Sequence, residues 1–203
     1  MSRGDARTPH VVVEERGAHA AVIRINRPEQ KNSLSAATLS DLGEAFSALD
    51  ARDDIDAIVF TGTRDVFASG ADIRELQTLT PDSALVFARR GQALFQKISG
   101  ARRLTVAAVN GFCMGGGLDL ALACRVRVAS NDAVFAHPGA RLGVITGWGG
   151  TQRLPALVGA PLAIEMFTTA RRLSAQEALE AGLVSRVDAD ALACALELAS
   201  RLG

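Results

Sequence analysis

The feature that most constrains the fold is an apolar stretch interrupted once by glycines. Residues 106–109 are small or β-branched and apolar, Gly115–Gly117 follow shortly after, and residues 118–123 are almost entirely apolar again. The first run is typical of a buried strand and the second of a buried helix. A turn this rich in glycine lets a ligand approach the main chain, and the first N–H groups of a helix lack intrahelical partners. The stretch therefore predicts a strand–turn–helix unit whose backbone donors suit an oxygen that gains negative charge.

Length and charge narrow the class of protein. With 203 residues, 48% of them hydrophobic, the chain can bury the core of one globular domain. We expect this domain to span residues 11–203, after a flexible tail over 1–10. Lys plus Arg and Asp plus Glu each number 22, so the formal net charge is zero. This balance argues against nucleic acid and anionic membranes as partners. No apolar run approaches the ~20 residues that a membrane-spanning helix needs.

The cysteines indicate the compartment. Cys113, Cys124 and Cys194 are odd in number and lack the spacing of metal ligands, so we predict free, buried thiols and no metal site. Residues 1–10 contain no apolar signal core. The sequence therefore predicts a protein of the reducing cytoplasm.

Strand-like and helix-like segments alternate along the chain. Residues 11–14 and 20–26 predict a hairpin around Gly17, and Ser35 is a candidate N-cap for the next helix. The apolar stripe of that helix comprises Leu39, Leu42, Phe46 and Leu49. Further strands are expected over 55–61, 103–110 and 125–129, with a loop over 62–73. This succession predicts an α/β fold of ββα-like units.

Capping residues mark several other helices. Thr80-Pro81 predicts a helix start. Leu85, Leu94, Phe95 and Ile98 are expected to face inward from this helix. The chain reads as helical from Gly159 onward, with a capping box at Ser174 to Glu177 and a last helix over 189–202.

Three ordered motifs resemble those of one protein family. FASGADIRE (67–75), NGFCMGGGLD (110–119) and GGTQRL (149–154) are similar to signatures of the enoyl-CoA hydratase/isomerase, or crotonase, superfamily. NRP (26–28) and the segment from LSA (173–175) to AGLV (181–184) match in the same order. The resemblance implies a crotonase-like spiral of ββα units that binds an acyl-CoA thioester. It implies that the backbone N–H groups of Ala71 and Gly116 hold the thioester oxygen.

The resemblance also implies a binding path for coenzyme A. The matching segments place four residues along the CoA and thioester and four in the loop that receives the pantetheine and adenine end. These are Ala71, Asp72, Ile73 and Arg74, and then Lys31, Asn32, Ser33 and Leu34. Arg74 stands where the family often has Lys. Arg74 and Lys31 could equally be solvated surface charges.

The chain departs from the hydratase pattern at the acid–base pair. Hydratases of the family use two glutamates, and the corresponding positions are Asp119 and Gly139. Hydration needs a group that deprotonates water and a proton source for the α carbon, and glycine supplies neither. Asp119 could act alone with a water, or as the single base of an isomerase. Alternatively, it merely stabilises the first turn of its helix.

Other residues could replace the missing glutamate. His137 lies two positions before Gly139, on the same face if the segment is a strand, and a histidine can serve as a base near neutral pH. A structural role for His137 is the alternative. Thr146 and Arg141 are weaker candidates, and Arg141 could pair with a substrate carboxylate in a decarboxylase.

Two further departures concern the acyl pocket. Trp148 stands where the family commonly has a small residue, so it either reshapes the acyl pocket or packs in the core or between subunits. Family members usually continue for several tens of residues beyond the equivalent of Arg201, so the helical C-terminal region looks truncated. By resemblance, we expect a homotrimer or a hexamer built as a dimer of trimers.

Two kinds of function remain open at this point. The first is an enzyme that hydrates or isomerises an enoyl-CoA, with decarboxylation of an acyl-CoA as a third reaction. It would need no separate cofactor, because coenzyme A is part of the substrate. The second is a non-catalytic acyl-CoA-binding or assembly protein, which Gly139 and the short C-terminal region favour.

Overall fold

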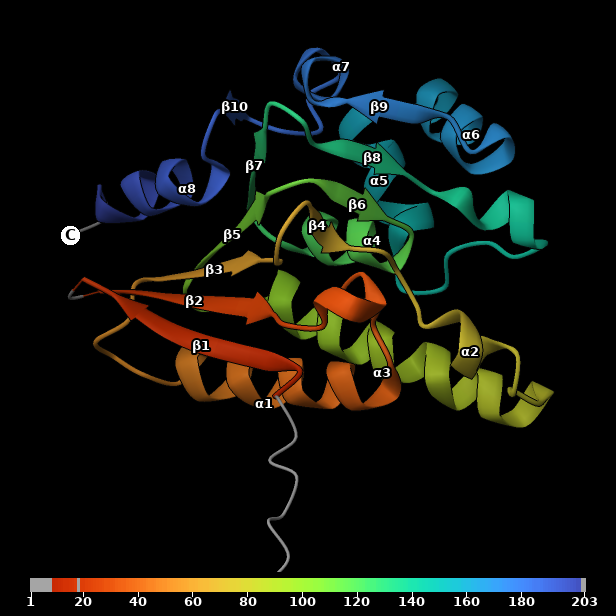
Figure 1. Ribbon diagram of the computed structural model, residues 1–203, viewed down its shortest axis with the longest axis horizontal. Helices are drawn as coiled ribbons and strands as arrows, with labels where there is room; N and C mark the ends of the chain where they lie inside the picture. The colour runs from red at the N-terminus through yellow and green to blue at the C-terminus, as the bar shows by residue number, and fades with distance from the viewer. Residues whose placement is uncertain (1–8, 18, 202–203) are drawn as a thin grey trace, which may run out of the picture.

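The computed structural model describes residues 9–17 and 19–201, arranged as two β-sheets with helices around them (Figure 1). The strands are β1 (Val11–Arg16), β2 (Ala20–Ile25), β3 (Ala57–Thr61), β4 (Val66–Ala68), β5 (Leu104–Val109), β6 (Phe112–Met114), β7 (Val126–Ser130), β8 (Val134–Ala136), β9 (Arg172–Ser174) and β10 (Arg186–Asp188). The α-helices are α1 (Ala36–Asp50), α2 (Ile73–Leu76), α3 (Pro81–Ser99), α4 (Gly116–Ala123), α5 (Gly150–Val158), α6 (Ala160–Thr169), α7 (Ala175–Glu180) and α8 (Ala191–Ser200). Two 3-10 helices, η1 (Pro28–Gln30) and η2 (Pro138–Leu142), lie in connections.

The sheets confirm the predicted ββα spiral. The larger sheet has the order β1-β2-β3-β5-β7-β10 and is parallel except for the β1–β2 hairpin. The smaller sheet has the order β4-β6-β8-β9, and its first three strands are parallel. In three successive turns of the chain, β3–β4, β5–β6 and β7–β8, one strand is added to each sheet before a helix follows.

Alternate side chains of the larger sheet supply two apolar cores. Val22, Val59 and Val106 lie in register on β2, β3 and β5 and pack with Cys194 and Ala195 of α8. Their neighbours along the strands point to the other face and join the larger core with α1, α3 and α4. This alternation follows from the two-residue period of a strand. The motif segments 67–75 and 110–119 contribute side chains to the larger core.

Local signals were reliable at several helix starts. Ser35 caps α1 by accepting from Thr38 N at 3.1 Å. Ser174 and Glu177 form the predicted capping box of α7. The hairpin around Gly17 and the start of α3 after Thr80 are likewise confirmed.

Some sequence expectations were wrong. The expected loop over 62–73 contains β4, and the region expected to be helical after Gly159 also contains β9 and β10. Leu85 does not face inward but is 52% exposed, because it lies on the outer face of α3. Strands of three residues carry too little periodicity to be recognised.

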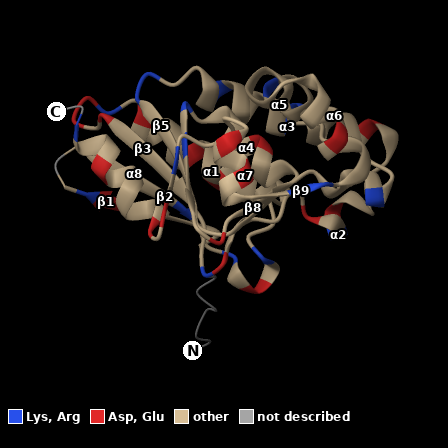
Figure 2. Cartoon of the chain, turned by 90° about the horizontal axis from the view of Figure 1, so that it is seen from above, with Lys and Arg blue, Asp and Glu red and all other residues tan. Residues whose placement is uncertain are grey.

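Charged residues of both signs are mixed over the surface. Figure 2 shows basic and acidic residues interspersed over the elements seen from above. The three predicted free cysteines are all buried. Among residues 9–17 and 19–201, none of the helices has the length and apolar character needed to cross a bilayer. Residues 1–8 of the expected tail lie outside the described part, whereas His10 O accepts from Asn26 N at 2.7 Å.

Candidate active site

The glycine turn places one backbone donor at the start of α4. Gly115 has a φ of 52°, which favours glycine, and its N–H donates to Ala136 O at 2.9 Å. Asp119 N donates to Gly115 O at 3.0 Å and closes the first turn of the helix. Gly116 is the first residue of α4, so its N–H has no acceptor within the helix. The turn therefore leaves this N–H available to a ligand.

A second donor comes from the loop between β4 and α2. Leu34 N donates to Gly70 O at 2.8 Å, and Asp72 N donates to Leu34 O at 3.3 Å. Because a trans peptide is planar, the bond to Gly70 O also fixes the opposite direction of the Ala71 N–H. The Ala71 N–H consequently points away from Leu34.

The two donors lie close together. A Cβ atom placed on Gly70 would lie 3.2 Å from Gly116 N, and one placed on Gly116 would lie 3.5 Å from Ala71 N. The structure thus brings together the pair that the sequence motifs nominate. Two converging N–H groups can stabilise an oxyanion, and removing one such donor typically costs about 3 kcal/mol of barrier.

Asp119 is a fully buried acid one helical turn from Gly116. Thr146 Oγ1 donates a hydrogen bond to Asp119 Oδ2, while Oδ1 has no partner among the described residues. Burial raises the pKa of Asp119 to about 7, although hydrogen bonds from Thr146 and the Trp148 backbone and the charge of Arg153 oppose the increase. An acid with this pKa can both accept and return a proton near neutral pH.

His137 lies beside Asp119 without a hydrogen bond to it. Its Nε2 is 3.6 Å from Asp119 Oδ1, and its ring packs against Phe167 with centroids 4.8 Å apart. Neither ring nitrogen has a hydrogen-bond partner in the described part of the chain. Burial lowers the pKa of His137 to about 4, so the imidazole is neutral at physiological pH. This arrangement supplies a neutral neighbour for the acid.

The position of the missing glutamate lies in η2 and has no room for a side chain. A Cβ atom on Gly139 would clash with Val144 O and would lie 3.2 Å from Val144 C. Val144 N also donates to Gly139 O at 3.0 Å, which closes this loop tightly. Arg141, in the same 3-10 helix, is exposed. The local backbone is therefore shaped around glycine.

Trp148 packs in the core directly beside the glycine turn. It is 4% exposed, and its ring lies 5.2 Å from Phe87 and 5.7 Å from Phe95, centroid to centroid. A Cβ atom on Gly116 would clash with the indole. Trp148 thus packs in the core, and its role in shaping an acyl pocket stays a prediction. The same contact places the indole at one wall of the oxyanion site.

The residues proposed to follow coenzyme A differ in exposure. Lys31, Ile73 and Arg74 are exposed, whereas Ser33 and Asp72 are buried. Lys31 belongs to the rim of a cleft of about 230 Å³, which is lined by Pro28, Lys31, Thr63, Arg64, Asp65, Val66 and Phe112. A cation at the rim of a cleft suits a phosphate-bearing ligand.

Two residues gain importance that the sequence did not assign to them. The sequence indicates Thr146 only as a weak substitute for the missing glutamate, yet its hydroxyl donates a hydrogen bond to the Asp119 carboxyl. Arg27 enters the sequence argument only as part of the NRP motif, yet its guanidinium contacts Ser33 and Asp72. In both cases the role of the residue follows from its closeness in space to a motif residue, and spacing in the sequence does not reveal that closeness.

Comparisons with known proteins agree with this geometry. The family model for enoyl-CoA hydratase/isomerase matches residues 15–202. A crotonyl-CoA hydratase of Syntrophomonas wolfei is 39% identical over 177 residues, which are 87% of this chain and 68% of the relative. A probable enoyl-CoA hydratase of Rhizobium meliloti is 40% identical over 94% of this chain and 75% of the relative.

Solved structures give the same result at the level of the fold. An enoyl-CoA hydratase from Bacillus anthracis superimposes with a TM-score of 0.91 at 33% identity, over 95% of this chain and 76% of that chain. Pseudomonas aeruginosa DspI superimposes with a TM-score of 0.91 at 36% identity, over 99% and 83% of the two chains. The agreement extends across both sheets and most of the helices. The chain belongs to the enoyl-CoA hydratase/isomerase family.

Proposed function

We propose that this protein acts on an enoyl-CoA thioester, by hydration or by double-bond isomerisation. The observation that carries the proposal is the buried carboxyl of Asp119, with a pKa of about 7, one helical turn from Gly116, whose backbone donor lies close to that of Ala71. The hydratases among its relatives support the substrate class. The thioester oxygen would bind between the N–H groups of Ala71 and Gly116.

One carboxyl can carry out the proton transfers of both reactions. In isomerisation, the Asp119 carboxylate removes a proton from the α carbon of a 3-enoyl thioester, and the protonated acid returns it to the γ carbon. In hydration, the carboxylate removes a proton from a water that adds to the β carbon, and the acid then protonates the α carbon. An enolate oxygen forms between Ala71 and Gly116 in each case, where the donors stabilise its charge.

Of the two reactions, isomerisation is the one that the lack of a second carboxylate at Gly139 favours. Hydration with two acids divides the proton transfers between them, whereas isomerisation needs only one group that accepts and returns a proton. Thr146 keeps Asp119 Oδ2 occupied, so Oδ1 is the oxygen free to exchange a proton. His137 lies 3.6 Å from Oδ1 and has a pKa of about 4, so it stays neutral and the proton remains with Asp119.

The test uses crotonyl-CoA and but-3-enoyl-CoA as separate substrates. Hydration lowers the absorbance of the conjugated thioester, and isomerisation of the second substrate raises it. We expect Asp119→Asn to reduce kcat by about 100-fold or more, because the proton-transfer group is removed, with little change in acetyl-CoA binding by calorimetry. An unchanged kcat would remove Asp119 from the mechanism.

The same assay separates the remaining alternatives. Release of CO₂ from a malonyl-type thioester would indicate the decarboxylase. Binding of acetyl-CoA without turnover of any of these substrates would indicate the non-catalytic protein, which the glycine at position 139 favours. No binding would overturn the proposal altogether.

We further propose a homotrimer or hexamer, a cytoplasmic location and no separate cofactor. Exposed apolar side chains around η2 and α6 support the assembly, because buried contacts with other subunits would cover them. They are Leu142, Val144, Ile145 and Ile164, each at least 50% exposed. Sedimentation at several concentrations tests the assembly, and a monomer throughout would contradict it.

A further inference from the structure

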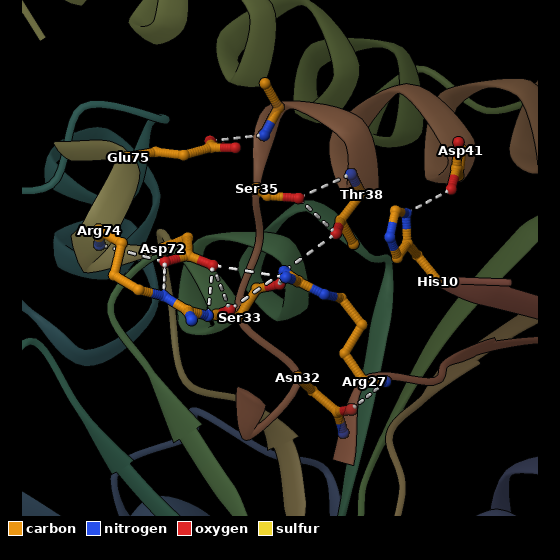
Figure 3. A network of polar contacts seen from close by, with 11 residues as sticks. His10, Arg27, Asn32, Ser33, Ser35, Thr38, Asp41, Asp72, Arg74 and Glu75 are labelled. Atoms are coloured by element: carbon orange, nitrogen blue, oxygen red, sulfur yellow. Dashed lines mark hydrogen bonds and ion pairs between the residues drawn. The ribbon is translucent and has the colours of Figure 1, made fainter. Parts of the chain in front are cut away.

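A buried side-chain network joins the two loops that flank Ala71. Figure 3 shows the Arg27 guanidinium reaching across from the end of β2 towards Ser33 and Asp72. Arg27 Nη1 donates to Ser33 O at 2.7 Å and to Ser33 Oγ at 3.1 Å, and Nη2 lies 3.5 Å from Asp72 Oδ2. The side chains of Arg27 and Asp72 are only 13% and 8% exposed. Charged groups buried to this extent require such partners.

The Asp72 carboxylate is fully engaged within the protein. Its Oδ2 accepts from Ser33 Oγ at 3.0 Å, and its Oδ1 accepts from Arg74 N at 3.1 Å as the N-cap of α2. Burial raises the pKa of Asp72, but hydrogen bonds from Arg74 and Ser33 outweigh this effect and keep the pKa below its ordinary value. Asp72 is therefore an anion whose oxygens already have donors, and a negative charge here does not suit the phosphates of coenzyme A.

The residues of this network flank the backbone that sets the direction of the Ala71 N–H. Ser33 precedes Leu34, whose N–H binds Gly70 O at 2.8 Å, and Asp72 follows Ala71 and donates its own N–H to Leu34 O. The peptide that carries the donor thus lies between two residues that Arg27 contacts. A shift of Ser33 relative to Asp72 would rotate the Gly70–Ala71 peptide and turn its N–H away from the substrate oxygen.

We propose that Arg27, Ser33 and Asp72 form a clamp that positions the Ala71 N–H for the thioester oxygen. The three residues are positioning residues and do not touch the substrate. The inference rests on the proposed function, because it assigns the clamp to that same oxyanion site. It also gives Asp72 a different role from the coenzyme A contact that its motif suggests.

The clamp makes a specific kinetic prediction. Arg27→Met and Asp72→Asn should lower kcat by about 10- to 100-fold, because small displacements of a catalytic group cost up to about 100-fold. KM should change little, since the clamp does not contact the substrate. Arg27→Lys should recover part of kcat, because an ammonium can bind Ser33 O or Asp72 but lacks the fork that reaches both.

Arg103→Met is the matched control. Arg103 is 15% exposed and contacts a carboxylate, Asp53 Oδ1 at 2.9 Å, and a backbone carbonyl, Arg52 O. It precedes β5 at the amino end of the strand, whereas the glycine turn follows the carboxyl end. We expect Arg103→Met to lose thermal stability as the Arg27 variant does and to retain its kcat. Ser33→Ala, which removes only the hydroxyl, keeps the test available if Arg27→Met does not fold.

A second readout does not require turnover. The infrared carbonyl stretch of bound ¹³C-labelled butyryl-CoA should fall on binding to the unmodified protein, because two donors polarise the thioester carbonyl. The shift should shrink in Arg27→Met, Asp72→Asn and Ser33→Ala, and persist in Arg103→Met. If the unmodified protein polarises the carbonyl but turns over no enoyl-CoA, the clamp stands and the catalytic proposal fails.

Three outcomes would overturn the clamp. The first is a higher KM with unchanged kcat in Arg27→Met, which would make the residue a binding group. The second is an unaltered carbonyl shift in all three clamp variants. The third is the absence of any shift in the unmodified protein, which would mean that the Ala71 donor does not meet the thioester.

Discussion

At Asp119, burial and hydrogen bonding act on one carboxyl in opposite directions. Burial favours the protonated form, while the Thr146 hydroxyl favours the anion, and the balance sets the pKa at about 7. His137 contributes no charge, because its own burial keeps it neutral. The result is an acid that is partly ionised at neutral pH although its side chain is fully buried.

This pKa predicts a pH dependence of stability. The native state binds more protons than the unfolded state between the ordinary pKa of 3.8 and the native value of about 7, so the Asp119 contribution falls as pH rises through this window. Asp119→Asn has no such group. As pH rises through this window, we therefore expect the free energy of unfolding of the variant to increase relative to that of the unmodified protein, by up to about 1.4 kcal/mol per pH unit. This difference should reach a plateau above pH ~7.

Urea denaturation of both proteins from pH 4 to 8 checks this expectation. The comparison with Asp119→Asn is necessary because His137, whose pKa burial lowers from 6.5 to about 4, gives the opposite slope between these values. A difference in stability that does not vary with pH would mean that Asp119 is ionised in the native state over the whole range.

At the scale of elements, the loop before α5 packs against α3 at a glycine of that helix, Gly91. Trp148, in that loop, packs between Phe87 and Phe95 of α3 and over Gly91. The glycine in the middle of α3 lowers helix propensity, but it leaves space for the indole. This packing fixes the loop that carries Thr146, and hence the partner of Asp119.

Alanine substitutions at two helical glycines should have opposite effects. A Cβ atom on Gly91 would lie 2.6 Å from Trp148 Cε2, so Gly91→Ala should destabilise the protein by about 1–3 kcal/mol. On Gly43 of α1 the nearest atom would be Leu94 Cδ1 at 3.6 Å, an ordinary contact. Gly43→Ala should therefore stabilise by about 0.5–1 kcal/mol through helix propensity. Equal stabilisation in urea denaturation would contradict the packing of Trp148 on Gly91.

At the scale of the whole molecule, two cores of unequal size cover the two faces of the larger sheet. Cys113 and Cys124 belong to the larger core, and Cys194 belongs to the smaller core beneath α8. Burial raises the pKa of Cys113 well above its ordinary value and that of Cys124 to about 12. The Cys113 and Cys124 thiols are therefore both inaccessible and protonated in the native state.

Thiol labelling should report the separate stability of the two cores. In native buffer we expect negligible reaction of all three cysteines with a thiol reagent, because all three side chains are buried. In rising urea, Cys194 should react first, since α8 is held by the smaller core and can open locally. Mass spectrometry of peptides identifies each labelled site. Simultaneous labelling would indicate that α8 unfolds only with the rest of the molecule.

The sequence by itself determined the features that depend on neighbouring residues. The glycines at 115–117 and the capping residues Ser35 and Ser174 predict local turns and helix starts, and the ordered motifs imply, by resemblance, the ββα spiral and the family. These signals are local because turn geometry, capping and hydrophobic periodicity act over a few residues. The three-residue strands β4 and β9 were missed, because they gain their stability from pairing with distant strands.

Only the tertiary structure decided how the site is set for chemistry. The Asp119 carboxyl takes its hydrogen bond from Thr146, 27 residues away, and its pKa from the surrounding core. The direction of the Ala71 N–H likewise depends on Leu34, which a separate segment brings into place. A pKa and a donor's direction are properties of the three-dimensional surroundings, so the motifs could nominate these groups but not fix their state.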